Sequence, residues 1–306
     1  MPDAYAKQTM CYTFSKLSSI NLPRRRIAIA ILHVGIWFLH CFVVNECYIG
    51  SRDGSTPLHK ATLDGHVNIV YILLQNHARI DIANNIGSKP LHNVASNGSE
   101  KVLDILLQYG AQIDVKNNKG ATPLHESASN GNEKVVDLLL QNGAPIDVMD
   151  KDGSASLHLA IFSGSNKIVE ILLKHGCPID IENKDGSTPL LYAASSGNNK
   201  VVEMLLQNGV EIDMMDNDGS IPLHYGASND NEKVVDTLLQ NDAQIDVKNN
   251  DGSTPLHESS SNGRNKIGLT PFHIVASNVH DKVVDTLLHY GAQIGAKDND
   301  RSSPLL

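Results

Sequence analysis

The chain has 306 residues, 41 % of them hydrophobic, so it is long enough to bury a sizeable core, which argues against wholesale disorder. Its formal net charge of −9 argues against a generic nucleic-acid-binding protein, which needs a basic face to neutralise phosphates. Four cysteines are too few and too scattered for a disulfide framework, so we expect a reducing compartment and a cytoplasmic location.

The first fifty residues contain no repeat. Their main feature is an apolar stretch, Ile27–Val44, that follows Arg24–Arg26 and is interrupted by His33, Gly35 and His40. A membrane anchor is one interpretation, although a spanning helix takes roughly 20 apolar residues and this stretch is at the short end. A secretory signal peptide fits less well, because the segment before the apolar stretch is long. The other interpretation is an apolar segment that covers the open face of the first repeat, or sequence that is not native.

From residue 51 onward, a 33-residue period governs the sequence. The string Thr-Pro-Leu-His, or a close variant, recurs with a constant interval, and its second residues are Pro57, Pro90, Pro123, Ser156, Pro189, Pro222 and Pro255. Pro271 then follows after only 16 residues, and Pro304 after a further 33. So many equal intervals exclude chance, and the repeat predicts the fold.

Each period has the sequence signals of two short helices. In residues 117–149, Thr122 is a good N-cap and Pro123 suits the first helical position. Gly131 and Gly143 are placed to end the two helices in a left-handed conformation. The second helix of each unit carries a leucine pair, and we expect these pairs to form one continuous core: 73/74, 106/107, 139/140, 172/173, 205/206, 238/239 and 287/288.

The array is interrupted near its C-terminal end. Complete units are expected at 51–83, 84–116, 117–149, 150–182, 183–215, 216–248 and 265–297, with a stub at 298–306. Residues 249–264 form half a unit, which keeps the motif but lacks a second helix. A packing defect or kink is therefore expected near 263–268. A real deletion and a mis-assigned exon both remain open as explanations, as they do for the abrupt C-terminus.

This pattern resembles the ankyrin repeat over residues 51–306. The resemblance implies an all-α solenoid of helix–turn–helix units with projecting β-turns, which normally has no catalytic activity. It also implies a structural role for the motif residues, with each histidine bonded to backbone between turn and helix. These residues include Thr56, Pro57, His59, Thr122, Pro123, His125, Thr254, Pro255, His257, Thr270, Pro271 and His273.

We expect no catalytic residue, metal site or cofactor. The motif histidines lie one per layer, about 10 Å apart, so they cannot converge on one metal ion. The turns at 150–153 and 216–219 resemble calcium loops only faintly, because neither has the glutamate at position 12. No nucleophile elbow, phosphate loop or zinc-protease string occurs.

The family resemblance places partner contacts on the concave face, at the turn tips and on the first helices. Bulky side chains occupy such positions in the middle of the array: Leu159, Phe162, Tyr192 and Tyr225. Charged turn residues that would frame them are Lys151, Asp152, Lys184, Asp185 and Asp218. The alternative is that these side chains merely pad the inner helices.

The sequence therefore predicts a monomeric, non-catalytic scaffold or adaptor that binds another protein and no nucleic acid. One alternative is a membrane-anchored or membrane-acting ankyrin-repeat protein, a channel or toxin fragment, that uses Ile27–Val44 as its anchor. Another is a regulatory subunit of an enzyme such as a ubiquitin ligase, protease or kinase. The function rests on analogy at the level of the fold.

Overall fold

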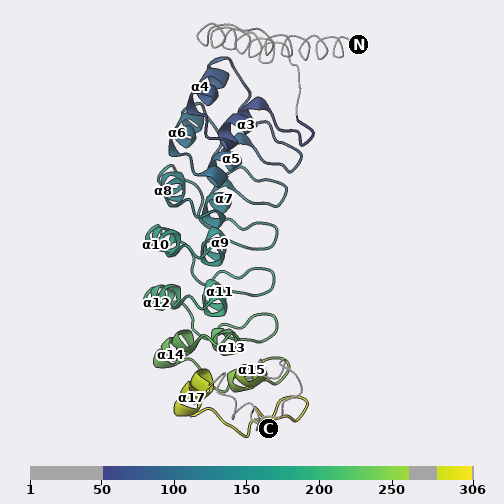
Figure 1. Ribbon diagram of the computed structural model, residues 1–306, viewed down its shortest axis with the longest axis vertical. Helices are drawn as coiled ribbons and strands as arrows, with labels where there is room; N and C mark the ends of the chain where they lie inside the picture. The colour runs from purple at the N-terminus through teal and green to yellow at the C-terminus, as the bar shows by residue number, and fades with distance from the viewer. Residues whose placement is uncertain (1–50, 262–280, 305–306) are drawn as a thin grey trace, which may run out of the picture. The chain divides into compact units, whose positions relative to one another are not determined.

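The computed structural model describes residues 51–261 and 281–304, and within these ranges the regular elements are all helices (Figure 1). Residues 72–78 group apart from the remaining described residues, which form one compact unit. This larger unit contains every described helix except the end of the second one. The apolar stretch at 27–44, the motif residues Thr270, Pro271 and His273, and the expected kink at 263–268 lie outside the described residues.

The described helices alternate between two types, as the repeat predicts. The first helices begin at the motif, and they are α3 (Pro57–Leu63), α5 (Pro90–Asn97), α7 (Pro123–Ser129), α9 (Ser156–Phe162), α11 (Pro189–Ser196), α13 (Pro222–Ser228) and α15 (Pro255–Ser261). The second helices are α4 (Val67–Gln75), α6 (Glu100–Gln108), α8 (Glu133–Gln141), α10 (Asn166–Lys174), α12 (Asn199–Gln207), α14 (Glu232–Gln240) and α17 (Asp281–His289).

Reciprocal caps start the first helices. In α3, the Thr56 hydroxyl accepts a hydrogen bond from the His59 N–H, and His59 Nδ1 accepts one from the Thr56 N–H at 3.1 Å. Helix α9 keeps half of this cap although Ala155 replaces the threonine, because His158 Nδ1 still accepts from the Ala155 N–H at 3.1 Å. The cap can therefore survive loss of the threonine when the histidine is kept.

Left-handed glycines end the helices where the sequence predicts them. Gly131 has a φ of 74° and Gly143 a φ of 83°, so both predictions are confirmed.

The core differs in one respect from the prediction. Only the first leucine of most pairs is fully buried: Leu106 is 0 % exposed, whereas Leu107 is half-buried. Successive helical residues point about 100° apart, so both cannot face the same seam. In α6, α8, α10, α12 and α14, two buried residues nearer the N-terminus complete the core, as Val102 and Leu103 do in α6.

The helices of neighbouring units pack on their equivalents. The first helices make an unbroken series of contacts from α3 to α15, and the second helices do so from α6 to α14 (Figure 1). Each unit therefore buries its apolar face against its neighbours, which a single unit could not do.

A second helix, α17, lies beside the first helix of the expected half unit. Helix α17 contacts both α15 and α14, so it occupies the place in which a missing helix was expected. Its following turn also continues the stack, because the Asn299 N–H donates to the Asp251 carbonyl at 3.0 Å. The sequence prediction assigned α17 to a unit with the motif at Thr270–His273. The described contacts place it instead beside the first helix that starts at Pro255.

Candidate protein-binding surface

Six of the seven described first helices carry a motif histidine that joins its unit to the turn that follows. In each one, Nδ1 accepts a hydrogen bond from the backbone N–H three residues earlier, so Nε2 carries the proton and donates. Nε2 lies 2.9–3.3 Å from a backbone carbonyl oxygen of the next turn, and the pairs are His59–Ser88, His92–Ala121, His125–Ser154, His158–Ser187, His224–Ser253 and His257–Ser302. These side chains thus connect neighbouring units.

Burial lowers the pKa of five of these imidazoles, because the charged form loses its hydration: His59, His92, His125, His158 and His224. Leu191 stands at the equivalent place in α11 and cannot donate such a bond. There the Thr188 hydroxyl still caps the helix by accepting from the Leu191 N–H at 3.3 Å.

The acidic turns use their oxygens internally. One carboxylate oxygen of Asp150 accepts from the N–H groups of Asp152 and Ser154 at 2.9 and 2.8 Å. This is the usual local bonding of an aspartate in a turn. Among the residues that the structure describes, no group of three or more histidine, cysteine or acidic side chains is arranged to hold a metal ion.

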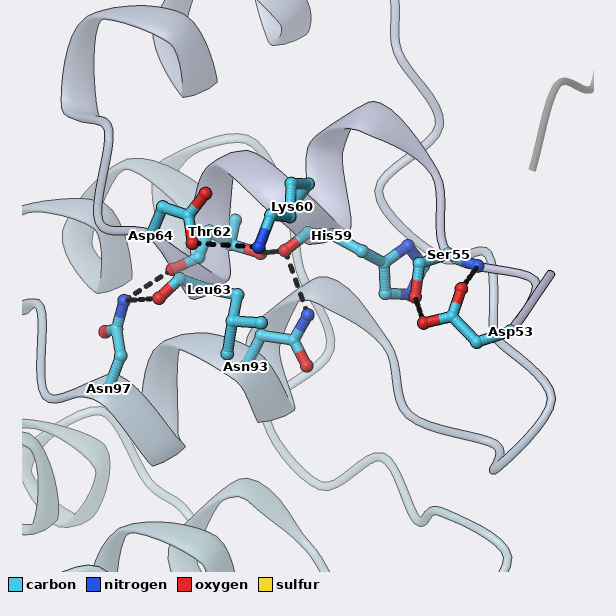
Figure 2. A network of polar contacts seen from close by, with 9 residues as sticks. All are labelled: Asp53, Ser55, His59, Lys60, Thr62, Leu63, Asp64, Asn93 and Asn97. Carbon is cyan, nitrogen blue, oxygen red and sulfur yellow. Dashed lines mark hydrogen bonds and ion pairs between the residues drawn. The ribbon is translucent and has the colours of Figure 1, made fainter. Parts of the chain in front are cut away.

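Asparagine amides cap the exposed ends of preceding helices, a feature that the sequence reasoning missed. Figure 2 shows Asn97 donating to the carbonyls of Thr62 and Leu63 at 2.6 and 2.8 Å, while Asn93 donates to that of His59 at 2.9 Å. The last carbonyls of a helix lack partners within it, so the Asn97 bonds stabilise the end of α3, and all three bonds stabilise the junction between units.

Backbone hydrogen bonds also join the turn tips in a continuous ladder. The tip N–H of each unit donates to a tip carbonyl of the unit before it at 2.8–3.0 Å; the donors are residues 85, 118, 151, 184, 217, 250 and 299. At five of these positions an asparagine amide adds a second bond to the preceding turn. Lysine occupies the other two, Lys151 and Lys184.

The charged side chains expected to frame the binding surface all lie at these tips and are exposed: Lys151, Asp152, Lys184, Asp185 and Asp218. Their backbones are fixed by the ladder, so the tips present charge from a rigid support.

The two tyrosines are half-buried, and their hydroxyls are already used within the protein. Tyr225 donates to the Asp216 carboxylate at 2.6 Å, and burial together with this bond raises the pKa of Tyr225. Tyr192 accepts from the Asn183 amide at 3.1 Å, and its ring lies edge-on to that of His158, with centroids 5.4 Å apart. A partner can therefore reach the exposed part of each ring, while the hydroxyls brace the turn against the helix.

Glu126 and Glu258 occupy the same place in their units and make the same kind of brace. Glu126 accepts from the Asn117 amide at 3.0 Å, and Glu258 from the Asn249 amide at 3.3 Å. The sequence contains a signal for this brace that was overlooked: the two braced residues are nine positions apart in every such unit.

Phe162 is the most exposed of the expected contact residues. Its side chain is 77 % exposed, while Leu159, one helical turn earlier, is half-buried. The equivalent place holds serine in five other described units and Leu63, 45 % exposed, in the first. The row is therefore polar through most of the array, with one large aromatic side chain in its middle.

Comparison with protein families identifies the repeat. The family model described as ankyrin repeats (3 copies) matches residues 27–117, 112–183, 175–249 and 213–298. The chain is an ankyrin-repeat protein. A search of curated protein sequences found no significant match. Ankyrin repeats are a protein-interaction module, typically without catalytic activity, so the exposed surface rather than an enclosed pocket is the candidate site of this ankyrin-repeat protein.

The membrane interpretation depends on residues 27–44, which lie outside the described ranges. Within 51–261 and 281–304, no helix combines the length and the apolar character that crossing a bilayer requires.

Proposed function

We propose that residues 51–306 form a non-catalytic binding module, a scaffold or adaptor that recognises another protein on its inner-helix surface. This surface consists of the exposed side chains of the first helices and the turn tips, the concave face in ankyrin-repeat proteins. The observation that carries the proposal is the exposure of Phe162. When a partner covers an exposed aromatic ring on a rigid helix, apolar surface leaves the water, and this favours binding.

The fixed backbone around Phe162 supports this role. Neighbouring units are joined by histidine bonds and by the tip ladder, so little order has to be gained when a partner binds. Leu159 and the exposed edge of Tyr192 extend the apolar area, and the charged tips supply a polar rim. An aromatic centre with a polar rim is the usual anatomy of a protein interface.

The test is affinity capture from cell extract with the full chain as bait, compared with two serine variants. Phe162→Ser installs the side chain that most other units carry at this place, so the helix should tolerate it. Leu63→Ser is the matched control, because it removes an exposed apolar side chain from the same row in the first unit.

A partner that is captured by the parent and by Leu63→Ser, but lost with Phe162→Ser, supports the proposal. Circular dichroism must show that both variants keep the parent's helical content. Capture of the same proteins by all three baits would contradict it. Tyr192→Phe is a useful third variant, because it removes the internal hydroxyl bond and leaves the exposed ring in place.

A further inference from the structure

The surface around Phe162 is continuous with the turn tips, as the bonding in an equivalent unit shows. The Glu126 carboxylate lies 3.3 Å from the Ser96 hydroxyl on one side and 3.0 Å from the Asn117 amide on the other. One side chain thus spans from the serine row of one unit to the base of the next turn. Two units further along the chain, the same three places are held by Phe162, Tyr192 and Asn183.

The tips that follow Phe162 carry a row of carboxylates. Asp185, Asp218 and Asp251 hold the same position in three consecutive units, all are exposed, and none forms an ion pair within the described part of the chain. Lys184 stands beside Asp185, whereas asparagine precedes Asp218 and Asp251. The surface next to the exposed phenylalanine therefore becomes acidic towards the C-terminal units.

The ladder fixes the spacing of this row. Each unit contributes two hydrogen-bonded chain segments to the turns, as in the bonds from the Asn183 N–H to Ser187 and from the Lys184 N–H to Asp152, 3.1 and 3.0 Å long. Segments bonded in this way lie about 4.8 Å apart, so equivalent carboxylates repeat about every 10 Å. A chain extended in the polyproline II conformation advances about 3.1 Å per residue with three residues per turn, so every third side chain faces the same way and meets one unit.

We propose that the partner binds through an extended segment with arginine or lysine at every third residue and an apolar side chain beyond the last of them. The basic side chains would pair with Asp185, Asp218 and Asp251, and the apolar one would cover Phe162. Charge complementarity selects this occupant over an acidic or purely apolar segment. The inference rests on the proposed function and adds to it the chemistry of the partner.

The test uses fluorescence anisotropy with the full chain and two labelled 13-residue peptides. The first has three arginines separated by two residues each and a leucine at each end, so that either chain direction can place a leucine at Phe162. The second has the same composition with the arginines adjacent. At low salt we expect the spaced peptide to bind about tenfold more tightly, because only it can pair with three tips at once. Added salt should weaken binding.

Single variants of the protein locate the contact. Asp218→Asn should weaken binding of the spaced peptide about 2- to 5-fold. The control Asp104→Asn removes the same charge from the exposed side of α6 and should leave affinity unchanged. Equal affinity for the two peptides would overturn the inference, as would an Asp104→Asn effect as large as that of Asp218→Asn. The proposed function would still stand after either result if Phe162→Ser abolishes capture of a protein partner.

Discussion

Removing residues 264–279 should stabilise the C-terminal part of the array. Three contacts there span 16 more residues than their equivalents elsewhere. The bond from His257 to Ser302 spans 45 residues, whereas the equivalent bonds of the other motif histidines span 29. The bond from Gln293 to Asp246 spans 47 residues, whereas the equivalent bond from Gln244 to Asp213 spans 31. The tip bond between Asn299 and Asp251 shows the same excess. Deleting 16 residues restores the regular interval.

The magnitude follows from the connection between the helices. Nineteen residues separate Ser261, the end of α15, from Asp281, the start of α17, whereas three separate Ser228 from Glu232 in the preceding unit. The entropic cost of closing a connection of n residues grows as (3/2)RT ln n, so shortening it from 19 to three residues should raise the free energy of unfolding by about 1.6 kcal/mol. The remaining Asn-Gly-His connection contains the Gly-His sequence that precedes α4.

Urea unfolding followed by circular dichroism measures this change, and hydrogen exchange locates it. We expect the amides of α15 and α17 to become better protected, while those of α5 to α8 keep the protection of the parent. Lower stability, or loss of protection in α17, would refute the reasoning, since it would mean that the deleted residues support the helix. His257→Ala checks the pairing itself: loss of its bond to Ser302 should cost about 1–3 kcal/mol in the parent and in the deletion variant.

Three further predictions concern the motif histidines, a glycine at a turn tip and the Tyr225 brace. Lowering the pH from 7.5 to 5.5 should reduce the free energy of unfolding. Burial holds the pKa of five motif histidines below the ordinary 6.5, so the unfolded chain binds more protons than the folded chain in this pH range. Unchanged urea midpoints would contradict this. Gly153→Ala should destabilise the protein more than Gly143→Ala, measured by thermal unfolding; both have positive φ, but only at Gly153 would the new Cβ lie 2.7 Å from a backbone nitrogen, that of Lys184. Tyr225→Phe should cost about 1–3 kcal/mol in urea unfolding because it removes a donor to the buried Asp216 carboxylate, whereas Tyr109→Phe, at an exposed ring, should be nearly neutral.

Most of the fold could be predicted because its signals are local and repeated. The cap at Thr122 and the glycines at 131 and 143 depend on a few neighbouring residues, and the period multiplies each signal. The assignment of α17 could not be predicted in this way. Pairing of helices is decided by contacts between segments, and the sequence offers two motif copies, at Pro255 and Pro271, before a single second helix.

The bonding of the candidate side chains could not be predicted from the sequence, and their contact with a partner stays a prediction. The resemblance places Phe162 and Tyr192 on the inner-helix surface, but it does not distinguish their roles. The Tyr192 hydroxyl accepts a hydrogen bond from the Asn183 amide, whereas Phe162 makes no such bond and is 77 % exposed. Such pairings depend on distances across a turn, which a linear pattern does not contain.

The tip ladder has an electrostatic direction. Its seven backbone bonds all run from an N–H of one unit to a carbonyl of the unit before it, so the carbonyl oxygens point towards the C-terminal units. Peptide dipoles aligned head to tail add, as they do along a helix, and their negative end lies on the carbonyl side. The ladder therefore has a net dipole along the stack of units, and its dipole moment increases with every added repeat. A cation that approaches the tips is drawn towards the C-terminal units even before it meets a carboxylate.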